Sequence, residues 1–168
     1  HVNSGNKPAA LAAVIHDHEG DRVIVFARTK HGADKLVHKL AQSNIEAAAI
    51  HGNKSQGQRE KALARFRDGS LHVLVATDIA ARGIDVPGVT LVINHDLPNV
   101  PEVYVHRIGR TARAGKAGLA IAFCAPDERP LLKDIEKLIK LSVPVLDPPE
   151  GIAAATAAAE PAPQDSQR

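Results

Sequence analysis

Hydrophobic residues occur in five short runs that are separated by longer segments with helical periodicity. Most of the runs are apolar on successive positions instead of alternating, which is typical of strands buried on both faces of a parallel sheet. The five runs are RVIVFA (22–27), EAAAI (46–50), HVLVAT (72–77), VTLVIN (89–94) and LAIAFC (119–124). Helices are predicted at about 8–18, 31–42, 55–68, 101–108 and 127–140. This alternation predicts a doubly wound parallel α/β sheet flanked by helices.

The composition changes at Pro144, where the stretch PVLDPPEGIAAATAAAEPAPQDSQR begins. It has few large apolar side chains, so burial there cannot offset the entropy lost on ordering. We predict one domain over residues 8–143 and a flexible tail over 144–168. A short helix at 152–160 is the alternative for part of the tail, because alanine favours helix. The chain contains no methionine and begins at His1, and we interpret it as a piece of a longer protein.

The overall composition is that of a soluble globular protein, with 44% hydrophobic and 24% charged residues. The formal net charge is only +2, so any basic surface must be local. Cys124 is the single cysteine, which excludes an intramolecular disulfide and favours a reducing compartment. No apolar run reaches the roughly 18 residues of a membrane span, and no signal peptide is visible. We therefore expect a cytoplasmic protein without a membrane partner.

Polar, glycine-rich segments follow the predicted strands. They are ARTK (27–30), HGNKSQGQRE (51–60), TDIAARGID (77–85) and, before the last strand, HRIGRTARAG (106–115). Ligands of doubly wound sheets bind at the carboxyl ends of the strands, where backbone N–H groups and arginines can hold phosphates. Each segment alone could be ordinary turn chemistry, with Thr77 or Asp78 acting only as a helix cap. Four such segments at one edge indicate an anion-binding site.

Three arginines recur at every third position in the last of these segments. They are Arg107, Arg110 and Arg113, on a backbone interrupted by Gly109. Such a row of cations indicates that anions are held there. A solvated helix face is the alternative, but it has no need of a glycine that weakens a helix by about 1 kcal/mol relative to alanine.

Five motifs, in chain order, resemble those of a known family. They are VIVFART, HGNKSQGQRE, VATDIAARGIDVP, VINHDLP and YVHRIGRTARAG. The set closely resembles the C-terminal RecA-like domain of DEAD-box RNA helicases over about residues 8–140, and RTARAG resembles the bacterial RhlE-type branch. The resemblance implies a RecA-like (P-loop NTPase-type) sheet, and it makes residues 1–7 the remnant of an interdomain linker.

The resemblance also implies roles for individual residues. Arg110 and Arg113 would be catalytic arginine fingers that face the γ-phosphate of ATP. The other positions implied to bind ATP are Asp85, at the ribose, and Gly83. The positions implied to hold the RNA backbone are Gly52, Gln56, Arg59, Thr77 and Arg82. His106 and Arg107 would couple the two sites, and Ala112 departs from the glycine usual between the fingers.

The aromatic content bears on how RNA would be recognised. The chain has three phenylalanines, one tyrosine and no tryptophan, and none lies in the segments implied to bind RNA. Base stacking needs aromatic faces, whereas contacts to the sugar–phosphate backbone position nucleic acid without reading its sequence. We therefore expect sequence-independent, salt-dependent RNA binding.

Half of an ATP site is missing from the sequence. There is no GxxxxGK[ST] phosphate loop and no Asp-Glu-Ala-Asp segment. The resemblance implies that the intact enzyme uses ATP and Mg²⁺, with Mg²⁺ held by an N-terminal RecA-like domain, and that the isolated chain is inactive. The expected partners are RNA, that domain, and proteins of ribosome assembly or RNA decay. The alternative is a stand-alone RNA- or protein-binding module without catalysis.

Other candidate sites are weaker. The segment HDHE (16–19) has the residue types of a metal site, but adjacent helical residues diverge by roughly 100° and cannot converge on one ion. We interpret it as a solvated helix end and predict no metal site. Cys124 lies in an apolar run, where cysteine behaves as a small hydrophobe.

Overall fold

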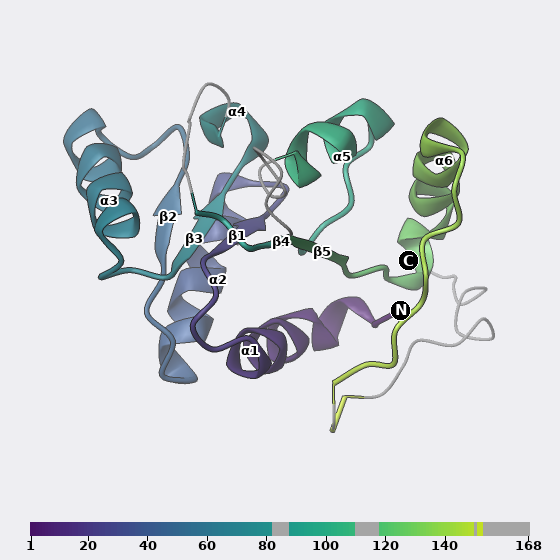
Figure 1. The fold of residues 1–168 in the computed structure, drawn as a ribbon, viewed down its shortest axis with the longest axis horizontal. Coiled ribbons are helices and arrows are strands. Elements are labelled where there is room, and N and C mark those ends of the chain that lie inside the picture. Colours follow the sequence, from purple (N-terminus) through teal and green to yellow (C-terminus); the bar gives the residue numbers. More distant parts are fainter. Residues whose placement is uncertain (82–87, 110–117, 150, 153–168) are drawn as a thin grey trace.

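A parallel sheet of five strands forms the centre of the protein in a computed structural model, which describes residues 1–81, 88–109, 118–149 and 151–152. The strands are β1 (Val23–Phe26), β2 (Ala48–Ile50), β3 (Val73–Ala76), β4 (Leu91–Asn94) and β5 (Leu119–Ala122). Their order in the sheet is β2-β3-β1-β4-β5, and every neighbouring pair is parallel (Figure 1). The predicted doubly wound α/β fold in a single domain is confirmed.

Helices cover both faces of the sheet. They are α1 (Lys7–Asp17), α2 (Lys30–Gln42), α3 (Gln56–Asp68), α4 (Asp78–Ala81), α5 (Pro101–Ile108) and α6 (Arg129–Ile139), with short 3₁₀ turns at Ser4–Asn6 and Pro126–Glu128. The helices α1 and α2 lie below the sheet in Figure 1, α4 lies above it, and α3 lies at the left beside β2. The helices α3 and α4 pack on the face opposite to α1 and α2. All predicted strands and helices are present with small shifts at their ends, whereas α4 was not predicted.

Successive residues of each strand enter opposite layers of the core. In β1, Val23 and Val25 pack with α1 and α2, whereas Ile24 and Phe26 pack with α3 and α4. The central strands are therefore buried on every residue, which explains their continuous hydrophobic runs. A third cluster joins α5 and α6 and includes Cys124, whose thiol has a pKa that burial raises to about 11. Cys124 thus packs as a hydrophobic side chain, as predicted.

The first seven residues, which the sequence assigns to a linker remnant, contact the domain. Val2 is 4% exposed and donates its backbone N–H to the Cys124 carbonyl at 2.9 Å. Lys7 is also buried, and its ammonium group lies 3.2 Å from an oxygen of Asp96 and contacts the carboxylate of Glu128. The start of the chain is thereby joined to residues more than a hundred positions away.

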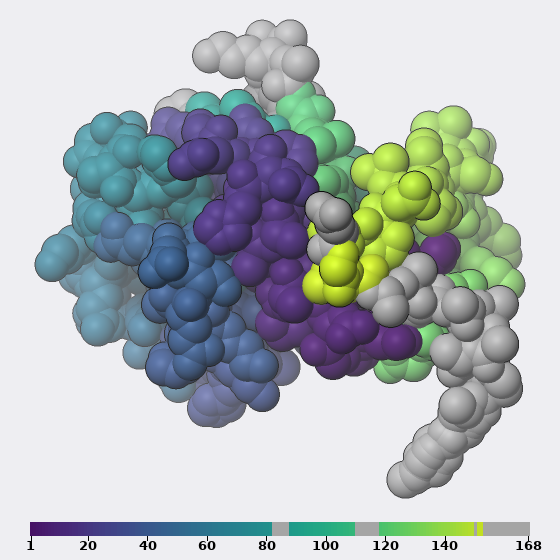
Figure 2. Space-filling model, turned by 90° about the horizontal axis from the view of Figure 1, so that it is seen from below, coloured from purple at the N-terminus to yellow at the C-terminus, as the bar shows by residue number. Residues whose placement is uncertain are grey.

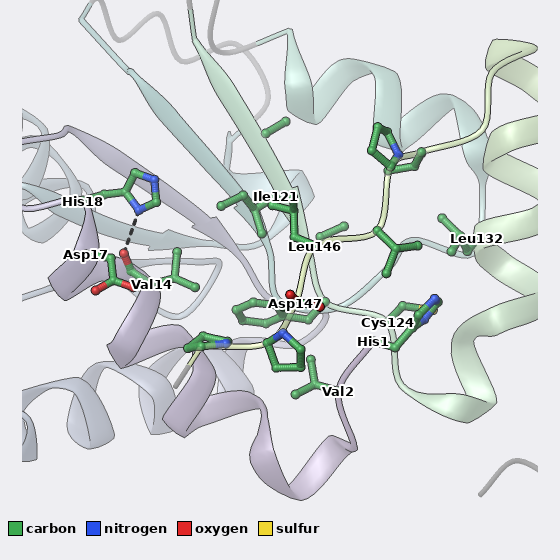
Figure 3. A pocket seen from close by; sticks show the side chains of 18 residues that line it. His1, Val2, Val14, Asp17, His18, Ile121, Cys124, Leu132, Leu146 and Asp147 are labelled. Carbon is green, nitrogen blue, oxygen red and sulfur yellow. Dashed lines mark hydrogen bonds between the residues drawn. The ribbon is translucent and has the colours of Figure 1, made fainter. Parts of the chain in front are cut away.

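The C-terminal segment 143–149 lies beside α1, where Figure 2 shows it in yellow next to the purple helix. Together with α1 and β5 it lines a mostly apolar cavity of about 250 Å³ (Figure 3). Val145 and Leu146 on this segment remain two-thirds exposed. None of the predicted ATP- or RNA-site residues that the structure describes lines the cavity.

The HDHE segment ends α1, as expected. His16 Nε2 donates to the Ser43 carbonyl at 3.1 Å, and His18 Nδ1 donates to the Val14 carbonyl at 2.9 Å (Figure 3). Both rings therefore bind backbone oxygens. Within the described part of the chain, no group of three His, Cys, Asp or Glu residues is arranged to hold a metal ion. The same part contains no helix that is long and apolar enough to cross a membrane.

Candidate functional site

The carboxyl ends of β2 and β3 bring two predicted RNA-binding segments together. Ile50 and Ala76 are register partners, and the Thr77 N–H donates to the Ile50 carbonyl at 3.3 Å. Farther along, Arg59 Nη2 donates to the Ala80 carbonyl at 3.4 Å. We call the resulting region the β2–β3 surface. It contains four of the predicted residues, Gly52, Gln56, Arg59 and Thr77.

The amino terminus of α3 forms part of the β2–β3 surface. Ser55 caps the helix, since its Oγ accepts the Gln58 N–H at 3.1 Å and its own N–H donates to Gln58 Oε1 at 2.8 Å. No acidic residue lies in the first turn. The N–H groups of Gln56 and Gly57 have no acceptor within the helix, and the helix dipole places partial positive charge at this end. The first turn of α3 is therefore suited to an anion.

Gly52 has no evident internal reason to be glycine. Its φ is not positive, and a Cβ added to it would meet no described heavy atom within 4 Å. Neither backbone conformation nor packing within the described residues thus excludes a side chain. The turn leaves open space where a ligand could approach the backbone closely.

Arg59 has unused hydrogen-bonding capacity. Its side chain is half-buried between α3 and α4, and its buried Nε has no partner among the described residues. The contact with Ala80 uses one terminal nitrogen only. The guanidinium can therefore accommodate an anion at the edge of the β2–β3 surface without breaking an ion pair.

Arg107 lies at the junction of three elements. Its Nε and Nη2 donate to the two carboxylate oxygens of Asp78, each at 2.7 Å, and Nη1 donates to Asn94 Oδ1 at 2.9 Å and to the Asp96 carbonyl at 2.6 Å. The side chain is only 3% exposed, and its guanidinium lies 5.1 Å from the centre of the Phe26 ring. We call the bidentate ion pair between Asp78 and Arg107 the Asp78–Arg107 fork. Together with the bond to Asn94, it holds the end of α5 against α4 and β4.

The geometry adds a partner for Arg107 that the row of three arginines did not indicate, the carboxylate of Asp78. The coupling role implied for Arg107 stays a prediction. Each of its nitrogens already has an acceptor inside the domain. His106, beside it on α5, is exposed, because successive helical residues point in different directions.

The residues predicted to meet ATP lie outside the described residues. These residues are Gly83, Asp85, Arg110 and Arg113, and the same holds for Ala112 and for the predicted RNA-binding Arg82. The described chain ends at Ala81 before the first group and at Gly109 before the second. The Asp78–Arg107 fork therefore joins α4, the last element described before the first group, to α5, the last element described before the second.

Sequence reasoning missed a buried ionic network at the same edge of the sheet. Burial acts to raise the pKa of Asp96, but His95, the Arg28 N–H and the Lys7 charge outweigh it and hold that pKa well below its usual range. Glu128 is 4% exposed and accepts from the N–H groups of Leu97 and Ala125. The motif VINHDLP contained Asp96, but nothing in the sequence identified its distant partners.

The chain resembles proteins of one family. Residues 6–115 match the model described as helicase conserved C-terminal domain. The pre-mRNA-splicing ATP-dependent RNA helicase PRP28 of Pyricularia oryzae is 50% identical over 142 residues, which cover 84% of this chain and 21% of that protein. Further relatives occur in bacteria and plants, and the chain spans about a fifth to a third of the length of these curated relatives.

Two solved structures agree with this match. E. coli DEAD-box protein SrmB, bound to the regulator of ribonuclease activity A, is 36% identical with a TM-score of 0.82, covering 93% of this chain and 94% of that one. S. cerevisiae Dbp5, bound to RNA and ADP BeF3, is 35% identical with a TM-score of 0.76, covering 81% and 37%. This chain therefore belongs to the helicase conserved C-terminal domain family, in the form found in DEAD-box RNA helicases.

Proposed function

We propose that this domain acts as the C-terminal half of an ATP-dependent RNA helicase. In this proposal the β2–β3 surface holds the RNA backbone, and Arg110 and Arg113 are arginine fingers for ATP bound by a second RecA-like domain. The Asp78–Arg107 fork is the observation that carries the proposal. It joins the residue after Thr77, on the RNA side, to the helix that leads into Arg110, on the ATP side.

Several features of the β2–β3 surface favour the backbone of RNA over its bases. The open turn at Gly52, the α3 amino terminus and the guanidinium of Arg59, which forms no ion pair with a described residue, all suit phosphate. The four aromatic residues of the chain, Phe26, Phe66, Tyr104 and Phe123, are at most 6% exposed. They cannot serve as stacking platforms, so binding is expected to be independent of sequence.

The carboxylates at the carboxyl-terminal edge of the sheet support placing Mg²⁺ on the second domain. Asp78 is engaged by Arg107, and Asp96 is engaged by Lys7 and the Arg28 N–H. These carboxylates are poor candidates for a metal that prefers oxygen ligands free of cations. The proposal therefore places ATP phosphates and Mg²⁺ on the second domain, and this chain contributes guanidinium groups. When bound, Mg²⁺ would neutralise charge on the phosphates.

The finer assignments are part of the same proposal. The segment RTARAG supports a bacterial RhlE-type origin, and with it a cytoplasmic location and partners in ribosome assembly or RNA decay. The match to SrmB, solved with a regulatory protein, supports the expectation that such a domain also binds proteins.

Replacing Arg59 by alanine tests the RNA-binding role. Removing one phosphate contact is expected to weaken binding of single-stranded RNA to this chain and to reduce the slope of log K against log salt by about 1. The measurement is a fluorescence-anisotropy titration at several salt concentrations. Arg67→Ala, at the far end of the same helix, is the control and should leave the slope unchanged. An unaltered slope for Arg59→Ala would contradict the proposal.

Replacing Gly52 by alanine separates binding from stability. Because Gly52 has open space around it and no positive φ, the melting temperature should stay the same or rise slightly, as for other compatible glycine-to-alanine changes. RNA affinity should fall, since the new methyl group occupies the space left for the backbone. Gly5→Ala is the matched control, because Gly5 has equally open surroundings and no positive φ. Unchanged affinity for Gly52→Ala would exclude Gly52 from the RNA site.

A further inference from the structure

We propose that His51 and Asp34 are positioning residues that hold the turn 51–54 in the shape that binds RNA. The inference rests on the proposed RNA-binding role of the β2–β3 surface. His51 follows β2 directly, and Asp34 lies on α2. Neither was singled out by the sequence, and neither would touch RNA itself.

The His51 ring connects the turn to a neighbouring helix. Its Nε2 lies 2.9 Å from Asp34 Oδ1, and its Nδ1 accepts the backbone N–H of Asn53 at 3.1 Å. A backbone bond from the Lys54 N–H to the His51 carbonyl, at 3.0 Å, closes the same turn. Gly52 and Asn53 are thus the two central residues of a turn that is held from inside by an imidazole.

The hydrogen bonds determine the tautomer of the ring. A backbone amide can only donate, so Nδ1 must present a lone pair to Asn53 and the proton must lie on Nε2. That Nε2–H then donates to the carboxylate of Asp34. The clamp therefore needs a neutral ring of one tautomer, and the carboxylate selects it.

Charges around Asp34 keep the acceptor ionised. Burial acts to raise the pKa of Asp34, but the hydrogen bond from His51 and the charge of Lys54 outweigh it and lower that pKa. Lys54 Nζ lies 3.4 Å from Asp34 Oδ1, and Lys30 Nζ donates to Asn53 Oδ1 at 3.3 Å. Lys30 and Asp34 thus contact the turn from α2, and Lys54 of the turn itself contacts Asp34.

The location of the clamp gives it a role beyond packing. His51 is 2% exposed, whereas Gly52 beside it is exposed and faces open space. The turn leads straight into Ser55 and the first turn of α3, which carries Gln56 and ends near Arg59. The direction of the turn therefore sets where three proposed RNA contacts lie. A second buried histidine, His95, has among the described residues only an ion-pair contact of 3.6 Å from its Nδ1 to Asp96, so burial alone does not impose a clamp of two hydrogen bonds.

Two substitutions of His51 separate its two bonds. Phenylalanine keeps a ring but removes both nitrogens. Asparagine cannot reach Asp34, but its side-chain oxygen can accept the N–H two residues ahead, as in an Asx-turn. His51→Phe is expected to weaken single-stranded RNA binding by the full chain about 3- to 10-fold, the value of one lost hydrogen bond. His51→Asn should retain most of the affinity.

The measurements are anisotropy titrations below the melting temperature of every variant, together with a ¹⁵N NMR spectrum of the histidine rings. A merely structural role would lower the melting temperature of both variants and leave the affinity of the folded protein unchanged. The spectrum of the parent chain should contain the signals of one ring with Nε2 protonated and Nδ1 unprotonated at neutral pH. These signals should be missing from the spectrum of His51→Phe. Unchanged affinity in His51→Phe, an equal loss in both variants, or the opposite tautomer would each overturn the inference.

Arg59→Ala distinguishes this failure from failure of the proposed function. If Arg59→Ala reduces the salt slope while His51→Phe binds RNA as the parent chain does, only the clamp is wrong. If Arg59→Ala has no effect either, the β2–β3 surface does not hold RNA. Both the proposed function of that surface and the inference about His51 and Asp34 are then wrong.

Discussion

Alanine at position 78 is expected to lower the free energy of unfolding by about 2–3 kcal/mol, less than the range of about 3–5 kcal/mol for a fully buried ion pair, because the Asp78 side chain is 36% exposed. Asp78→Ala leaves the Arg107 guanidinium, only 3% exposed, without its carboxylate partner. Two charge-assisted hydrogen bonds of 2.7 Å are lost at the same time. Urea denaturation with linear extrapolation measures the change.

A surface pair of the same shape provides the control. Arg65 donates to both oxygens of Glu46 at 2.7 and 3.0 Å, but these side chains are 36% and 63% exposed. Glu46→Ala should therefore cost about 1 kcal/mol or less. Equal losses for Asp78→Ala and Glu46→Ala would show that burial does not determine the strength of the Asp78–Arg107 fork.

Alanine at Arg110 or Arg113 is expected to have the largest effect on activity. In a polypeptide that joins this chain to a phosphate-loop domain, RNA-stimulated ATP turnover should fall by about 10³–10⁵-fold, the range for an arginine finger. RNA affinity should be nearly preserved, because these side chains would act on the transferred phosphoryl group. Phosphate release measured at saturating RNA gives the turnover, and this chain alone should release none.

Arg67→Ala serves as the control, since Arg67 lies near the end of α3, away from the start of the helix that borders the site. It should leave turnover unchanged. Loss of RNA affinity in parallel with turnover would place Arg110 or Arg113 in the RNA site instead. Robust phosphate release by the isolated chain would contradict the view that it holds half of an active site.

The fold could be predicted from the sequence because the central strands are buried on both faces. The stretches 23–27 and 73–76 are apolar on every position, and such continuous runs between helical segments are typical of a parallel sheet covered on both faces. The helix α4 was missed because Asp78–Ala81 spans a single turn, too short to show a periodic pattern. Its first residue was nevertheless recognised as a candidate cap.

The site was only partly predictable. The family resemblance implied Gly52, Arg59 and Thr77 because they lie in contiguous motifs, and their contact with RNA stays a prediction. The contacts of Arg107 and His51 were not predictable, because their carboxylate partners lie 29 and 17 positions away and become neighbours only when the sheet has formed. Spacing alone therefore could not show that Arg107 pairs with a carboxylate of its own domain.

The contacts of Val2 and Lys7 with Cys124 and Glu128 affect how the molecule is made. A ribosome releases the amino-terminal residues long before it has translated residue 128, and domains generally complete their folding as units. Until then Lys7 can pair only with Asp96 and not with Glu128. Nascent chains halted before residue 96 should expose an unsatisfied ammonium, and those halted before residue 119 should leave an apolar face of α1 uncovered by the last strand, which is the kind of surface that chaperones retain.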